Sequence, residues 1–162
     1  MSNIKKRIIE QYYAAIRFYP KAPSSLKMNF RVLTRENSLN LETVLREKYF
    51  DKQPIGYLNG EAGRKDMIDH VSGRLDHFRI TYIPFIDYYH KLKGSRILEI
   101  GGGTGCSTLA LVEQGAEVES IDIDGDSQHI SKHRLANYSL SASFISLMQL
   151  RLIKNSLRMN LI

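Results

Sequence analysis

Hydrophobic residues recur at helical spacing through residues 1–93, which predicts a largely helical first region. Its first amphipathic run ends at Pro20 and Pro23. A second run covers residues 38–50. The apolar positions of these two runs are Ile4, Ile8, Ile9, Tyr12, Ala15, Ile16 and Tyr19, followed by Leu39, Leu41, Val44, Leu45 and Tyr49. We expect one helix for each run, with these side chains on its buried face.

A third helix is predicted at about 64–80, after a loop at 53–60 that contains proline and glycine. Its buried face would be formed by Met67, Val71, Leu75 and Phe78. Pro84 either interrupts this helix or begins the next one, at 85–92. Residues 1–93 are therefore expected to form an α-helical N-terminal cap.

After Gly94 the pattern changes to short apolar runs that alternate with helical ones. Residues 96–100, Arg-Ile-Leu-Glu-Ile, form a short apolar run that is typical of a buried parallel strand. The elements expected next are a helix at 107–114, a strand at 117–122, a helix at 126–138 with Asp126 or Ser127 as its N-cap, and a third strand beginning at 143–145. This order predicts an α/β fold at 94–146, with an incomplete, Rossmann-like, doubly wound parallel sheet.

Composition excludes several classes of protein. The chain has 162 residues, 43% of them hydrophobic, enough for one domain with a real core. No apolar run approaches the roughly 20 residues that span a bilayer, and no secretory segment follows the basic N-terminus, so we expect a cytoplasmic protein without a membrane partner. One cysteine rules out a disulfide within the chain. The net charge is +6, but the tyrosines cluster in amphipathic segments, which does not favour nucleic-acid binding.

The candidate chemistry lies in a glycine-rich loop between the first expected strand and the helix after it. Glycines there permit a tight turn and a close approach of the backbone to a ligand. The dinucleotide-binding fingerprint requires glycine at its first, third and sixth positions, and Cys106 occupies the sixth. Glu99 followed by Gly101, Gly103 and Gly105 instead gives the pattern E-x-G-x-G-x-G. That pattern resembles motif I of the class I S-adenosylmethionine-dependent methyltransferases, and the resemblance extends over residues 96–124.

The resemblance implies S-adenosylmethionine as the cofactor and assigns roles to single residues. Glu99 would orient the methionyl amino group, and Asp122, at the end of the second strand, would hold the ribose hydroxyls. The backbone of the loop would pass close to the methionyl and ribose parts, at Gly101, Gly102, Gly103 and Gly105. Ile123 would pack on the adenine. Asp124 is an alternative ribose ligand, although its place in a turn favours helix capping for it and for Asp126.

Other candidates have plainer readings. Tyr57 and Arg74 could face the cofactor from the cap, or serve packing and surface roles. Cys106 is expected to fill a small buried space at the start of a helix. Five histidines lack the spacing of metal ligands, so no metal site is expected; they are His70, His77, His90, His129 and His133.

The residues after the third expected strand fit the family poorly. A methyltransferase of this class would continue with strands that face the methyl acceptor, whereas residues 147–162 form a basic, apolar tail without a clear period. Codons displaced by one base would permit the Asp-Ala and Phe-Asp typical of the family, so a frameshift near Ser146, a truncation and a gene fragment are the three hypotheses. Each predicts a missing substrate half and an exposed sheet edge, a candidate surface for self-association.

The sequence therefore predicts an S-adenosylmethionine-dependent methyltransferase whose methyl acceptor is unknown. No residue can be assigned as a catalytic base, and whether this chain alone is an active enzyme stays open. A non-catalytic, S-adenosylmethionine-binding regulatory module is one alternative. An NAD-dependent oxidoreductase is the other, and Cys106 in the third glycine position of the dinucleotide fingerprint argues against it.

Overall fold

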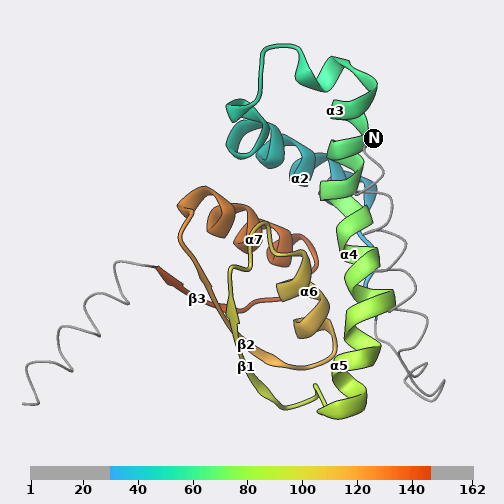
Figure 1. The fold of residues 1–162 in the computed structure, drawn as a ribbon, viewed down its shortest axis with the longest axis vertical. Coiled ribbons are helices and arrows are strands. Elements are labelled where there is room, and N and C mark those ends of the chain that lie inside the picture. The colour runs from blue at the N-terminus through green and yellow to red at the C-terminus, as the bar shows by residue number, and fades with distance from the viewer. Residues whose placement is uncertain (1–29, 147–162) are drawn as a thin grey trace, which may run out of the picture.

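A computed structural model describes residues 30–146 of the protein (Figure 1). The helix expected at 4–19 and the tail at 147–162 lie outside the described residues. The elements follow in the order α2 (Arg35–Lys48), η1 (Phe50–Lys52), η2 (Tyr57–Asn59), α3 (Glu61–Ile68), η3 (Asp69–Gly73), α4 (Arg74–His77), η4 (Phe78–Tyr82), α5 (Ile83–Tyr89), β1 (Arg96–Ile100), α6 (Cys106–Glu113), β2 (Glu117–Asp122), α7 (Gly125–Asn137) and β3 (Ser143–Ser146). Within this range no helix is long and apolar enough to cross a membrane.

The three strands form one parallel sheet in the order β1-β2-β3. Leu98 pairs with Glu119 of β2, and Glu119 in turn pairs with Ser143 of β3. Helix α6 connects the first pair of strands and α7 connects the second. The predicted α/β class with a Rossmann-like parallel sheet is confirmed, because short apolar runs separated by helical ones leave few other arrangements.

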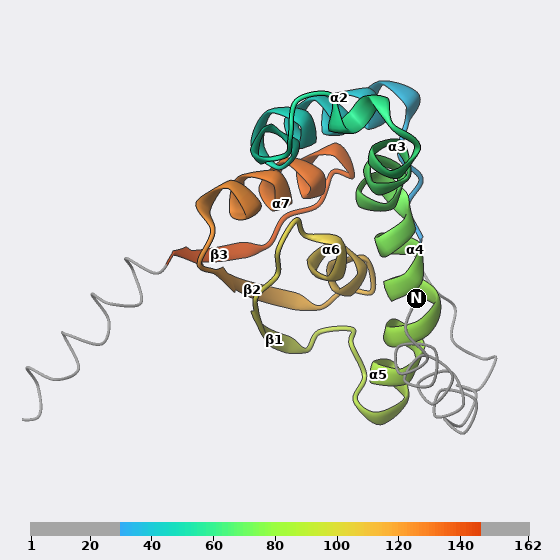
Figure 2. The ribbon, with the colours of Figure 1, turned by 45° about the horizontal axis from the view of Figure 1, so that its top comes forward.

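Helices cover one face of this sheet. Figure 2 shows α6 and α7 on the same side of the strands. Strands that follow one another in sequence order, joined by right-handed crossovers, place both helices on one face. On the opposite face the side chains of Leu98 and Ile100 are 58% and 80% exposed. The expectation that β1 is a buried strand is therefore wrong for the described residues, in which α6 and α7 cover one face of the sheet.

The cap helices α3, η3, α4, η4 and α5 follow one another without a break, beside α6 (Figure 1). The row begins at Glu61, earlier than the predicted residue 64. Pro84 lies in the first turn of α5, which begins at Ile83, in keeping with one of its two predicted roles, and the π-helical turn η4 precedes this helix. In η4 the N–H of Ile83 donates to Phe78 O, five residues back. A widened turn suits a proline, whose ring would collide with the carbonyl four residues earlier.

Helix α2 begins at Arg35 rather than at Ser38, because Thr34 caps it: the Thr34 hydroxyl accepts the N–H of Asn37 at 3.1 Å. Leu39, predicted to be buried, is 55% exposed. The buried face of α2 joins a cluster with the cap and with α7, formed by Leu41, Val44, Leu45, Phe50, Met67, Val71 and Ile130. A second cluster joins Leu75, Ile83 and Leu92 to α6 and β2. The cap and the sheet layer therefore share their cores.

Candidate functional site

The glycine loop joins the carboxyl end of β1 to the start of α6. Gly101, Gly103 and Gly105 have φ angles of 78°, 54° and 82°, in the left-handed region that favours glycine. A Cβ at Gly101 or Gly103 would meet no atom within 4 Å, so the loop presents bare backbone to open space there. A Cβ at Gly105 would lie 2.8 Å from Ser131 Cα of α7. Gly105 therefore serves the packing of the loop on α7, while Gly101 and Gly103 leave room for a ligand.

Glu99 lies under this loop. Its carboxylate accepts hydrogen bonds from the hydroxyls of Ser107 and Thr108, both at 2.5 Å, in the first turn of α6. A Cβ at Gly102 would lie 2.7 Å from Glu99 Oε2, so Gly102 lets the loop cross the carboxylate closely. The expected contact of Glu99 with a methionyl amino group stays a prediction.

Asp122 ends β2 beside the loop. Its Oδ2 accepts the N–H of Gly103 at 2.7 Å, and its Oδ1 accepts the N–H of Asp124 at 2.9 Å. A carboxylate has about four acceptor positions, so two remain for ligand hydroxyls. The same carboxylate thus fixes the loop and presents free acceptor positions. Ile123, the next residue, is 81% exposed, as a side chain that packs on a ligand requires.

Asp124 caps α7. Its carboxylate accepts the N–H groups of Asp126 and Ser127, both at 3.3 Å, and the Ser127 hydroxyl at 2.7 Å. The hydroxyl bond is the main cause that lowers the pKa of Asp124, although partial burial opposes it. The expectation that Asp124 caps the helix is confirmed, whereas Asp126 and Ser127, the other predicted caps, are wrong by two or three residues because α7 begins at Gly125. Asp126 instead pairs with Lys52 at 3.1 Å.

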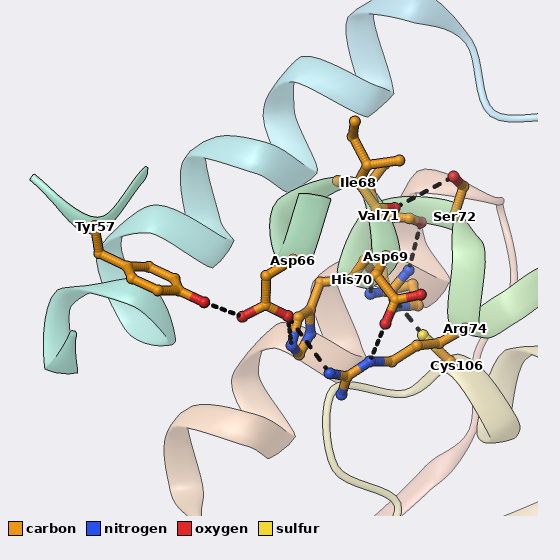
Figure 3. A network of polar contacts seen from close by, with 10 residues as sticks. Tyr57, Asp66, Ile68, Asp69, His70, Val71, Ser72, Arg74 and Cys106 are labelled. Carbon is orange, nitrogen blue, oxygen red and sulfur yellow. Dashed lines mark hydrogen bonds and ion pairs between the residues drawn. The ribbon is translucent and has the colours of Figure 1, made fainter. Parts of the chain in front are cut away.

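Tyr57 and Arg74, the two candidate cofactor contacts in the helical N-terminal region, both approach the carboxylate of Asp66. Tyr57 Oη donates to Asp66 at 3.1 Å, and this bond raises the pKa of Tyr57 (Figure 3). Arg74 Nε donates to Asp69 at 3.0 Å, and its Nη2 lies 3.7 Å from Asp66. Both side chains are thus held inside a network of the cap. A contact of either with the cofactor stays a prediction.

His70 lies in the same network and was not assigned a role from the sequence. Its side chain is fully buried, and neither ring nitrogen has a hydrogen-bond partner among the described residues. Burial lowers its pKa to about 4, the charge of Arg74 acts in the same direction, and Asp66 opposes both. The ring is therefore neutral at pH 7, and its 3.6 Å contact with Asp66 is no ion pair.

Arg134 of α7 was also missed. The side chain is fully buried and donates to Thr104 O in the loop and to Val71 O and His70 O in η3. Its position four residues after Ile130, on the buried face of α7, is a signal that the sequence does contain. Cys106 lies nearby, 5% exposed, and fills a buried space at the start of α6 as expected.

Other chemistry is sparse in the described range. A hollow of about 610 Å³ lies at the amino ends of the strands, away from the glycine loop, and its lining includes Arg96, Glu117 and Ser143. Among residues 30–146, no three His, Cys, Asp or Glu side chains come together as ligands for a metal ion. The carboxyl ends of β1 and β2 remain the candidate site.

The sequence is similar to that of a curated protein named as a methyltransferase. The chain is 36% identical over 64 residues to an uncharacterized methyltransferase of Staphylococcus carnosus, a match that covers 38% of this chain and 31% of the relative. No family model matches the chain.

Solved structures show a weaker likeness. A magnesium protoporphyrin IX methyltransferase with bound SAM, from Synechocystis, has 16% identity and a TM-score of 0.44, over 69% of this chain and 54% of that protein. Protein 1320 of Thermoplasma acidophilum has 16% identity and a TM-score of 0.37, over 67% and 45%. The chain thus spans about half the length of these proteins and less of the curated relative. The similarity to methyltransferases that the glycine motif predicts is confirmed by the curated relative.

Proposed function

We propose that residues 96–124 bind S-adenosylmethionine and that the whole protein transfers the cofactor's methyl group to an acceptor. One observation carries the proposal. The backbone at Gly101 and Gly103 faces open space beside the carboxylate of Asp122, which accepts two hydrogen bonds and has two acceptor positions left. A ligand with a chain on one side and a ribose on the other fits this arrangement. A dinucleotide fits less well, because Cys106 is buried where the dinucleotide fingerprint needs a third glycine.

The residues of this chain would bind and orient the cofactor. Asp122 would accept the ribose hydroxyls while its bond to Gly103 keeps the loop in place. Ile123 would cover the adenine, and Glu99 would support the loop beneath the methionyl group. When bound, the cofactor supplies an activated methyl group, so the protein mainly positions it against a nucleophile.

Calorimetric titration with S-adenosylhomocysteine, S-adenosylmethionine and NAD tests the proposal. We expect a binding isotherm for the first two compounds and none for NAD. In thermal unfolding, the first two should raise the melting temperature and NAD should leave it unchanged. Asp122→Asn should weaken binding at least about tenfold, because a charged acceptor of ribose hydroxyls is lost. Glu119→Gln is the matched control: it also replaces a carboxylate by an amide, three residues earlier on β2, where Glu119 pairs with the exposed Leu98, and affinity should stay unchanged.

The outcomes separate the alternatives. Binding of NAD in place of S-adenosylmethionine would favour an oxidoreductase. Cofactor binding without methyl transfer to any acceptor would favour a regulatory module. Equal losses of affinity in Asp122→Asn and Glu119→Gln would remove Asp122 from the site.

A further inference from the structure

Arg134 carries a charge that the described fold leaves without a counter-ion. Its side chain is 0% exposed, and no Asp or Glu among residues 30–146 forms an ion pair with it. A buried guanidinium is costly unless its N–H groups are bonded. Arg134 meets that need with backbone carbonyls alone, those of Thr104 at 2.8 Å, Val71 at 3.0 Å and His70 at 2.6 Å.

These carbonyls come from two segments that are distant in the sequence. Thr104 belongs to the glycine loop, whereas His70 and Val71 belong to η3 of the cap. η3 is a π-helical turn, in which the N–H of Arg74 donates to Asp69 O five residues back. Such turns are rare and are frequent at functional sites. One side chain therefore joins the loop to the widened turn of the cap helix row.

The neighbouring contacts place the loop between the same two elements. Ser131, one turn before Arg134 on α7, packs against Gly105. On the cap side, Cys106 Sγ lies 4.0 Å from His70 O, and Figure 3 shows these two residues close together. The loop thus rests on α7 at Ser131 and Arg134, and against η3 at His70.

We propose that Arg134 is a positioning residue for the glycine loop. Its hydrogen bonds link Thr104 to η3, so that Gly101 and Gly103 keep their open conformation before a cofactor binds. The inference rests on the proposed function, which places the cofactor at this loop. A preorganised loop loses less conformational entropy when its ligand binds. The planar fork of arginine can reach three carbonyls at once, which the single ammonium group of lysine does less well.

Hydrogen exchange without any ligand tests the fastening directly. The amides of 101–106 should exchange about ten times faster in Arg134→Met than in the wild type, and to an intermediate extent in Arg134→Lys. The matched control is Arg31→Met, because the Arg31 guanidinium also donates to two carbonyls, Tyr138 O at 2.8 Å and Ser139 O at 3.1 Å, at the other end of α7. This control should leave loop exchange unchanged.

Calorimetry with S-adenosylhomocysteine tests the consequence. Arg134→Lys should bind about tenfold more weakly than the wild type, since a less preorganised loop loses more conformational entropy when the ligand binds. In the wild-type protein, the ligand should slow exchange in η3 as well as in the loop. If Arg134→Met fails to fold, Arg134→Lys and the wild-type measurement decide the question.

Three results would overturn the proposal. The first is that Arg134→Lys has the loop exchange rates and the affinity of the wild type. The second is that Arg31→Met changes loop exchange as much as Arg134→Met does. The third is that the ligand slows exchange in the loop but not in η3. If the wild type binds no S-adenosylhomocysteine, the proposed function fails, whereas the exchange experiment still decides whether Arg134 positions the loop.

Discussion

The helix row α3–α5 is joined to the sheet layer by two buried arginines, one bonded to η3 and the other within η4, and the two junctions differ in chemistry. At the loop-side junction, Arg134 donates only to backbone carbonyls. At the far junction, Arg79 forms a bidentate pair with the buried carboxylate of Glu113, with Nε–Oε2 at 3.0 Å and Nη2–Oε1 at 2.5 Å. Charge is therefore balanced far from the candidate site and unbalanced beside it.

The guanidinium of Arg79 at the far junction has further partners besides Glu113. Arg79 Nη2 donates to Arg31 O at 2.8 Å, and its guanidinium lies 5.1 Å from the centre of the Phe30 ring. Burial alone would lower the pKa of Arg79, but the bonds and charge of Glu113 outweigh it and raise the pKa. At the loop-side junction, in contrast, the two ring nitrogens of His70 have no hydrogen-bond partner among the described residues. The difference indicates that the far junction stabilises the fold, since departures from full satisfaction concentrate at functional sites.

Removing the far arginine should give the largest loss of stability. Arg79→Met leaves the carboxylate of Glu113 buried and without its ion-pair partner, which costs about 3–5 kcal/mol of unfolding free energy. Chemical denaturation would measure the loss. Loop hydrogen exchange in the folded fraction should stay as in the wild type, because no bond of Arg79 reaches the glycine loop.

The double variant Arg79→Met, Glu113→Gln is the control for this experiment. Removing both charges should recover part of the lost stability, because the remaining amide needs only hydrogen bonds. If Arg79→Met is as stable as the wild type, the Arg79–Glu113 pair does not stabilise the fold. A double variant less stable than Arg79→Met would contradict the same claim.

The sequence predicted the sheet layer and the loop well because their signals are local. β1 and β2 have the expected bounds, and α6 ends as expected before Gly115, whose φ is 87°. Apolar period and glycine spacing depend on neighbours within a few residues. Asp122 could be placed at the end of its strand for the same reason.

The junctions could not be predicted in this way. Arg79 and Glu113 are 34 residues apart, and Arg134 and His70 are 64 apart, so only the packed structure brings them together. The exposure of β1 was missed for a related reason. An apolar run does not reveal whether helices cover one face of a strand or both, and among the described residues Leu98 and Ile100 of β1 are exposed.

His70 should make stability depend on pH at the loop-side junction. Its folded pKa of about 4 lies below the ordinary value of 6.5, so the unfolded chain binds the proton more readily. Stability is therefore complete above about pH 7 and falls as the pH is lowered toward 4, by roughly 3 kcal/mol in total. Thermal or chemical unfolding between these pH values measures the slope.

The comparison for His70 is His70→Leu, a side chain of similar volume that does not titrate. The stability of this variant should change less with pH over the same range. The charged neighbours of His70 are retained in it, so the difference from the wild type reports on the ring alone; they are Asp66, Asp69, Arg74 and Arg134. A slope equal to that of the wild type would assign the pH dependence to other groups. A flat profile in both proteins would show that the ring is not held neutral by burial.

Gly105→Ala should destabilise the loop-side junction by about 2–3 kcal/mol. A residue with a side chain is strained at a φ of 82° by about 1–2 kcal/mol, and its Cβ would press on the Ser131 backbone at 2.8 Å. Gly101→Ala has a similar φ of 78° but open space around the Cβ, so it should cost only the strain. The difference between the unfolding free energies of the two variants measures the cost of the Cβ contact with Ser131. Equal losses would show that α7 does not constrain the loop at Gly105.

Cys106→Ala should have the smallest effect, a loss of about 1 kcal/mol, because it removes one small buried side chain. Its contact with His70 O is a weak sulfur contact at 4.0 Å, and Arg134 Nη2 already donates to the same carbonyl. Loop exchange and affinity for S-adenosylhomocysteine should therefore stay within about twofold of the wild type, well below one tenfold step of 1.4 kcal/mol. A tenfold loss of affinity in Cys106→Ala would show that packing of η3 on α6, and not the bonds of Arg134, holds the loop.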